Sequence, residues 1–168
     1  MLTVLKRLLF GALLCFLVLL VGRWLVHAIA SEETRIRWKL EEMADGFDHT
    51  DTNQVLAGLA PDYFDQTYGA DRPSVRQALA YVFLQRKDPV TKGFLYEVEL
   101  PEDAMEIELV GEHEESARVT LLARFSEKRG DQRTVVWETR VKAEMIEREG
   151  EWMVATSEQE TVSGRLMR

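Results

Sequence analysis

The sequence predicts an α+β domain at residues 31–168, in which three helices precede a curved antiparallel sheet, behind one transmembrane helix within residues 1–30. Two observations carry this prediction. Apolar residues recur at helical spacing as far as Arg86, and from Gly93 onward they alternate with polar residues as in half-buried strands. The first 30 residues instead hold one long uncharged run. Helices followed by strands with one apolar face predict a sheet that wraps around the helices.

The N-terminal segment is predicted to anchor the chain in a membrane. Leu8 to Gly22 are 15 consecutive uncharged residues that follow two bases. This run alone spans about 22 Å as a helix, and extension to Ala30 reaches the ~30 Å of a hydrocarbon core. A basic leader favours a single-pass protein that contacts the membrane through residues 8–30 and exports its domain, to the periplasm if the cell is bacterial. The alternative is a signal peptide cleaved after Ala30, which would release a secreted protein.

The charge of the domain excludes some partners. The chain has a net charge of −8, and without the three bases of residues 1–30 there remain 18 bases against 29 acids, or −11. Phosphate binding needs a basic stripe, so we expect no nucleic-acid partner. The single Cys15 lies in the apolar run, which leaves the domain without a thiol nucleophile or thiolate ligand.

Three helices are expected before residue 90. Ser31 is a typical cap for the first, which presents an apolar face of Ile36, Leu40, Met43 and Phe47. Asp51 caps a short second helix that stops before Pro61, and Pro73 opens the third. The buried stripe of the third helix is expected to hold Val75, Leu79, Val82 and Phe83.

The strands are expected mainly after Gly93. The longest of them follows a turn at Gly130 and Asp131. Its inward residues are predicted to be Val135, Trp137, Thr139, Val141, Ala143 and Met145. An earlier short strand is predicted at residues 63–68, with Phe64 inward and Asp65 solvated on the opposite face.

This order of elements resembles the nuclear transport factor 2-like superfamily. The resemblance rests on Leu59–Phe64 (LAPDYF), on the helix from Pro73 to Arg86, and on Val141–Ile146 followed by a turn and Glu151–Val154. It covers nearly all of residues 31–162 and implies a cone-shaped α+β fold. The superfamily includes steroid isomerases, polyketide-cyclase-like enzymes, ligand-binding pockets and assembly modules, so the fold alone does not define an activity.

The isomerase chemistry of that superfamily finds no matching residues. The resemblance places its general-base Asp at Thr67, its oxyanion-binding Tyr at Met43 and its neutral Asp at Thr139. These three side chains cannot supply one proton acceptor and two donors around a carbonyl. Asp65 is the only spare carboxylate nearby. We therefore predict no catalytic residue.

Six residues are the candidates for lining a pocket in the cone. They combine aromatic bulk with a few polar groups, as small-molecule pockets do. They are Phe64, Gln66, Tyr68, Tyr96, Trp137 and Thr139. The alternative is that the aromatic residues simply fill the core. The three histidines are scattered and the acids at residues 112–115 suit a hairpin turn, so no metal and no cofactor is expected.

The sequence thus favours a membrane-anchored, non-catalytic binding or assembly module that acts on a protein partner or an apolar small ligand. The alternative is a small-molecule isomerase or cyclase-like enzyme that uses the cone cavity with Asp65 and Tyr68. A closed and filled cone would favour the first hypothesis. An open cavity with a desolvated carboxylate would favour the second.

Overall fold

The computed structural model describes residues 30–88, 91–111, 115–130 and 132–165. The transmembrane segment predicted at residues 8–30 lies almost entirely outside the described residues. Within the described ranges, no helix is both long enough and apolar enough to cross a membrane.

The helices begin where capping residues predict. Helix α2 spans Glu32–Asp48, and the Ser31 hydroxyl accepts the amide hydrogen of Thr34. Helix α3 spans Thr52–Ala57 behind the Asp51 cap. Helix α4 spans Arg72–Gln85, where the Asp71 carboxylate caps Ser74 N–H and a proline lies in the first turn. The three predicted helices are confirmed.

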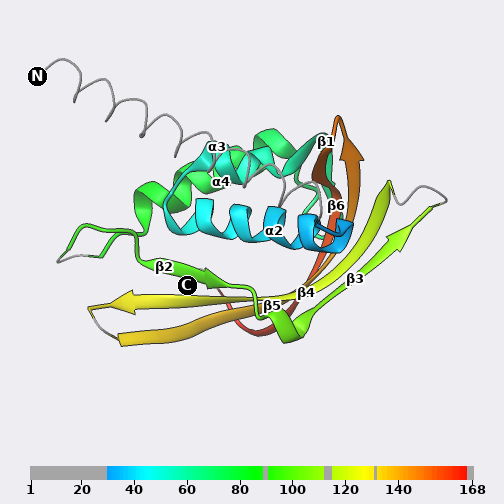
Figure 1. The fold of residues 1–168 in the computed structure, drawn as a ribbon. Helices are drawn as coiled ribbons and strands as arrows, with labels where there is room; N and C mark the ends of the chain where they lie inside the picture. The colour runs from blue at the N-terminus through cyan, green and yellow to red at the C-terminus, as the bar shows by residue number, and fades with distance from the viewer. Residues whose placement is uncertain (1–29, 89–90, 112–114, 131, 166–168) are drawn as a thin grey trace, which may run out of the picture.

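Six strands form one strongly curved sheet, and α2 runs across its concave face (Figure 1). The strands are β1 (Leu59–Asp65), β2 (Tyr96–Glu99), β3 (Met105–Val110), β4 (Ser116–Arg129), β5 (Gln132–Arg148) and β6 (Glu151–Gly164), with a short 3₁₀ helix, η1, at Glu102–Ala104. Their order is β1-β6-β5-β4-β2, and β3 also pairs with β4. The predicted α+β fold with a curved sheet is confirmed.

The prediction of a purely antiparallel sheet is wrong, because β1 joins β6 in parallel. This strand begins at Leu59, earlier than the predicted residues 63–68, and it includes Pro61. Proline is tolerated there because β1 is an edge strand with only one neighbour. Parallel pairing to the last strand of the chain depends on tertiary contacts, so local patterns do not reveal it.

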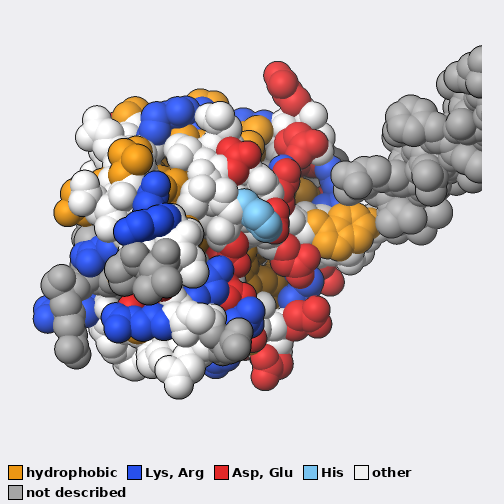
Figure 2. All heavy atoms as spheres, turned by 90° about the vertical axis from the view of Figure 1, so that its left-hand side faces the viewer, with side chains coloured by type: hydrophobic (Ala, Val, Ile, Leu, Met, Phe, Trp, Pro, Cys, Tyr) orange, Lys and Arg blue, Asp and Glu red, His pale blue; other side chains and the backbone are white. Residues whose placement is uncertain are grey.

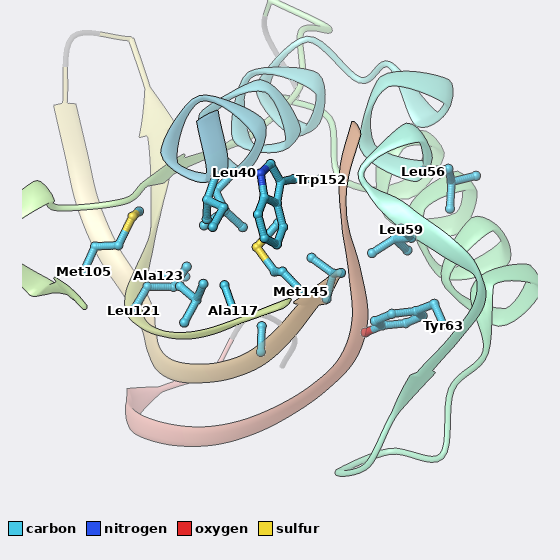
Figure 3. Packing of buried hydrophobic residues seen from close by; sticks show 14 residues of the cluster. Leu40, Leu56, Leu59, Tyr63, Met105, Ala117, Leu121, Ala123, Met145 and Trp152 are labelled. Carbon is cyan, nitrogen blue, oxygen red and sulfur yellow. The ribbon is translucent and has the colours of Figure 1, made fainter. Parts of the chain in front are cut away.

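Two ends of the sheet have different packing. We call the end at the β5–β6 turn (Glu149 and Gly150) the closed end, and the end at the β4–β5 turn (Gly130) the mouth. Near the closed end, α2 and the sheet enclose an apolar cluster in which Ile36, Met145 and Trp152 are almost fully buried (Figure 3). Nearer the mouth, Val82, Phe83 and Tyr96 form a second, smaller cluster.

A β-bulge changes the register of β5 near the mouth. Phe125 pairs with Trp137 and Ser126 pairs with Val135, so Val136 has no partner on β4. Val136 packs against the second cluster, whereas Val135 is 48% exposed. The predicted inward position of Val135 is therefore wrong, because one extra residue reverses the alternation. On the other side of the bulge, Thr139, Ala143 and Met145 are buried as predicted.

Candidate ligand-binding site at the mouth

The six pocket candidates do not lie together in the structure. Phe64, Gln66 and Tyr68 are exposed at the end of β1 and in the turn that follows it. The predicted inward position of Phe64 is wrong, because the inward residues of β1 are Tyr63 and Asp65. On β5, Thr139 is buried and donates its hydroxyl to Glu160 O, and Trp137 is partly exposed. Tyr96 lies near the mouth.

Asp65 is buried rather than solvated, which corrects the expectation from the sequence. Only 2% of it is exposed. Its Oδ2 accepts hydrogen bonds from Ser157 Oγ at 2.6 Å and from Gln159 Nε2 at 3.1 Å. Its Oδ1 accepts the amide hydrogen of Tyr68 at 2.7 Å. Both oxygens are therefore satisfied by donors from β6 and from the turn after β1, as a buried carboxylate requires.

Tyr63 extends this network into the core. Its hydroxyl lies 2.7 Å from Ser157 Oγ, and because the Ser157 proton is given to Asp65, Tyr63 acts as the donor. Burial raises the pKa of Tyr63; the Ser157 hydrogen bond opposes this rise, and the negative charge of Asp65 adds to it. Tyr63 therefore stays protonated, and the hydrogen bonds of Tyr63 and Asp65 to Ser157 stabilise the contact between β1 and β6.

A hollow of about 940 Å³ lies at the mouth. It is lined by Arg86, Leu95, Tyr96, Glu127, Arg129, Val135, Val136, Gly164 and Arg165. Four strands bring most of these residues together, because Tyr96 of β2 pairs with Glu127 of β4, and Arg165, which follows Gly164 of β6, donates its amide hydrogen to Val136 O of β5. Arg86 comes from the C-cap of α4. Leu95, Tyr96 and the two valines supply an apolar floor, and polar groups make up the larger part of the lining.

The backbone of the mouth is closely packed at Gly164. Its φ is +68°, and a Cβ there would collide with the carbonyl oxygen of Val136. Glycine permits both the left-handed conformation and the close approach of β6 to the bulge of β5. The bulge and this glycine together place Val135 and Arg165 at the same hollow.

An aromatic layer lies between the mouth and the closed-end cluster. The Phe47 ring is 5.3 Å from Phe94 and 5.5 Å from Phe125, with near-perpendicular planes in both pairs. Phe125 stacks on Trp137 with centroids 4.8 Å apart. The sequence analysis missed this layer, although helical spacing had assigned Phe47 to the apolar face of α2. Such rings stabilise the inner wall of the mouth.

The charges around the mouth are mainly positive. Figure 2 shows this side of the molecule, where Lys and Arg side chains gather over one region and acidic side chains over another. Within the hollow, Glu127 is neutralised by Arg129, whose Nε and Nη2 lie 2.7 and 2.6 Å from Oε1. Arg86 and Arg165 form none of the ion pairs found among the described residues. No sequence motif signals these two arginines, which are far apart in the chain.

A second hollow of about 610 Å³ is lined by Phe83 of α4, by Lys87 and Lys92, and by Asp48 and His49. Burial raises the pKa of Asp48, although the amide of Val98 donates to its carboxylate at 2.8 Å. Contact with the backbone and carboxylate of Asp45 raises the pKa of the exposed His49. This hollow is smaller than the one at the mouth, so it offers less room for a ligand and is the weaker candidate. The described residues contain no cluster suited to a metal ion.

Comparison with known proteins identifies the fold. No protein-family model and no curated protein matches the chain. Among solved structures, a protein of unknown function with a cystatin-like fold from Nostoc punctiforme has a TM-score of 0.62 and 13% identity, over 81% of this chain and 96% of that one. A ketosteroid isomerase-like protein from Erwinia carotovora has a TM-score of 0.56 and 16% identity, over 80% and 99%.

A nuclear transport factor 2-like protein of unknown function from Pseudomonas putida gives a TM-score of 0.57 with 18% identity, over 76% of this chain and 84% of that one. These likenesses establish that the described domain has the α+β fold shared by nuclear transport factor 2-like and cystatin-like proteins. At such identities they carry no statement about activity.

Proposed function

We propose that this protein is a non-catalytic binding module, anchored to a membrane through residues 8–30, that holds an apolar small ligand in the hollow at the mouth. One observation carries the proposal. Apolar side chains fill the space between α2 and the sheet near the closed end, whereas the mouth keeps a hollow with an apolar floor. A volume of about 940 Å³ lies within the range of pockets for small organic ligands.

The test compares two valines of equal exposure. Val135 is 48% exposed and lines the hollow, and Val162 is 50% exposed and lines neither hollow. The probe is N-phenyl-1-naphthylamine, a neutral aromatic dye whose fluorescence rises in apolar surroundings, titrated into the full-length protein in maltoside detergent. We expect Val135→Trp to weaken its binding about tenfold, the equivalent of about 1.4 kcal/mol of lost contact, because the indole fills the hollow. Val162→Trp should bind as the wild type does. Equal affinities in the two variants would exclude the hollow as the site.

Anchoring is tested separately on the full-length protein. We expect it to remain in the membrane fraction after an alkaline carbonate wash, because residues 8–30 are long enough to span the bilayer. Mass spectrometry of the mature N-terminus distinguishes the alternative. A chain that begins at Ser31 would show cleavage after Ala30 and a secreted protein.

One observation favours a second candidate, a small-molecule isomerase or cyclase-like enzyme. Asp65 is a desolvated carboxylate on the concave side of the sheet, as a general base in such a fold would be. Its oxygens are engaged by three donors, however, and Asp65 lines neither hollow. These contacts support a structural role and leave the non-catalytic module as the better proposal.

Deuterium incorporation discriminates between the two candidates. A base that removes a proton beside a ketone carbonyl returns deuterium to that carbon in D₂O, and mass spectrometry of a panel of cyclic ketones detects it. The non-catalytic module predicts no exchange above the buffer rate. Exchange that is lost in Asp65→Asn and kept in Asp62→Asn would instead support the enzyme.

A further inference from the structure

We infer that the hollow at the mouth is selective for an apolar organic acid, whose single anionic head is held by Arg86. This inference rests on the proposed function, since it names the chemical class of ligand for the same hollow. It comes from the electrostatics of the lining residues rather than from the shape of the hollow.

The side chain of Arg86 lines the hollow and has no hydrogen-bond or ion-pair partner among the described residues. Its Nε is buried and donates to no acceptor among the described residues, and its side chain enters no described salt bridge. Other atoms of the same side chain line the hollow, so an anionic ligand there would supply the counter-charge that the Arg86 guanidinium lacks.

The other charges in the hollow do not oppose an anion. Glu127 is already neutralised by its contacts with Arg129. Arg165 is exposed at the end of β6 and adds a second uncompensated cation at the rim. A planar guanidinium binds the paired oxygens of a carboxylate or sulfonate through two parallel hydrogen bonds.

The apolar floor selects the rest of the ligand. Leu95, Tyr96, Val135 and Val136 give it hydrocarbon and aromatic surface. A small inorganic anion would leave this surface exposed to water, and a neutral hydrocarbon would leave the Arg86 guanidinium without a counter-charge. An acid with one compact head and an aliphatic or aromatic body satisfies both parts of the hollow.

The test uses two dyes that differ in one group. 8-Anilinonaphthalene-1-sulfonate carries the rings of N-phenyl-1-naphthylamine and one added sulfonate. With the full-length protein in maltoside, we expect the sulfonate to bind about tenfold more tightly than the neutral dye, as a charge-assisted hydrogen bond predicts. Arg86→Gln should remove this preference, measured as the ratio of the two affinities in the same variant.

Matched variants make the outcome specific. Arg76→Gln removes an exposed arginine of the same helix that lines neither hollow, and it should leave the preference unchanged. Arg86→Lys keeps the charge and should restore part of the preference, which shows that loss in Arg86→Gln is not loss of fold. If Arg76→Gln and Arg86→Gln reduce the preference for the sulfonate dye equally, the inference is wrong. The preference would then depend on the overall charge of the protein and not on Arg86.

The failures of the two proposals are distinguishable. If the wild type binds both dyes equally while Val135→Trp weakens both, the hollow is the site and its selectivity for an acid is wrong. If Val135→Trp leaves both dyes unaffected, the hollow is not the site and both proposals fail.

Discussion

Arg35 at the closed end and Arg86 at the mouth differ in how many partners their side chains have within the same domain. Arg35 contacts Glu32 at 2.7 Å and Glu147 at 3.0 Å, and it donates to Gly150 O at 2.6 Å. These contacts join the first turn of α2 to the β5–β6 turn. Arg86 has no such partner among the described residues. The closed end therefore uses its charges to stabilise the fold, whereas the mouth has an arginine without an ion pair among the described residues.

The apolar residues repeat this contrast. Near the closed end the large side chains pack into one buried cluster, and Trp152 donates its indole N–H to Glu32 Oε2 at 2.8 Å. At the mouth, a bulge and an exposed valine interrupt the packing. Residues that leave a hollow contribute less packing, so we expect the mouth to contribute less to stability than the closed end does.

The largest expected effect compares the tryptophans of the two ends. Trp152 is 2% exposed, and Trp152→Ala should lower the free energy of unfolding by about 3–5 kcal/mol. Trp137 is partly exposed and retains mainly its stacking on Phe125, so Trp137→Ala should cost about 1–3 kcal/mol. Urea unfolding of the full-length variants, followed by far-ultraviolet circular dichroism, measures both. Equal losses would remove the contrast between the ends.

The next effect concerns the buried carboxylate between the ends. Asp65→Asn replaces one acceptor oxygen with an NH₂ donor, which must then face Ser157 and Gln159 or the amide of Tyr68. We expect a loss of about 1–3 kcal/mol in urea unfolding, the cost of an unsatisfied buried group. Asp62→Asn, which affects only an exposed pair with Arg148, is the control and should cost much less. A loss no greater than that of the control would contradict a structural role for Asp65.

The same residue shows where local patterns stop being informative. Caps at Ser31 and Asp51, and the proline after Asp71, define helices through contacts within a few residues, so the helices were predictable. The alternating pattern correctly predicted that Thr139 and Met145 are buried, but its prediction for Val135 was wrong. A bulge adds one residue to the strand, and an alternating pattern does not reveal where this happens. The burial of Asp65 depends on a parallel partner about 90 residues later in the chain.

The candidate site was less predictable than the fold. Of the six proposed pocket residues, Tyr96 lines the mouth hollow, and Phe64, Gln66 and Tyr68 lie at the end of β1 and in the turn after it. The arginines of the hollow come from α4, β4 and the end of β6. Their approach is produced by the curvature of the sheet, and no spacing along the chain encodes it.

The third effect tests the charged contacts of the closed end through pH. Burial alone would raise the pKa of Glu32, but hydrogen bonds from Trp152 and Arg35, together with the charge of Arg35, lower it below its ordinary value. The ionised group therefore stabilises the fold above its unfolded pKa, and this contribution is lost as the pH falls through the folded pKa. Glu32→Gln should cost about 1 kcal/mol at neutral pH, and its difference from wild type should shrink below about pH 4.

Urea unfolding from pH 7 to pH 3 measures that difference, with Glu33→Gln as the control in the same turn of α2. Glu33 is exposed and forms none of the hydrogen bonds found among the described residues. A difference for Glu32→Gln that stays constant with pH would show that the charge of Glu32 is not part of the closed-end contact.

The smallest expected effect lies on the convex face, midway between the two ends. Arg140 is 51% exposed in its side chain, and its one described ion pair is a 3.7 Å contact with Glu160, itself 73% exposed. Such pairs gain little because water screens them and both side chains lose freedom. Arg140→Ala should therefore change the free energy of unfolding by less than about 0.5 kcal/mol. Thr139 and Val141, the neighbours of Arg140 on β5, pair with β6 and face the concave side, so this variant also tests the register of β5. A loss from Arg140→Ala as large as that from Trp137→Ala would mean that β5 presents the opposite face to the core. The lining of the mouth hollow depends on the register of β5 at Val135 and Val136, so the description of the hollow would then be wrong as well.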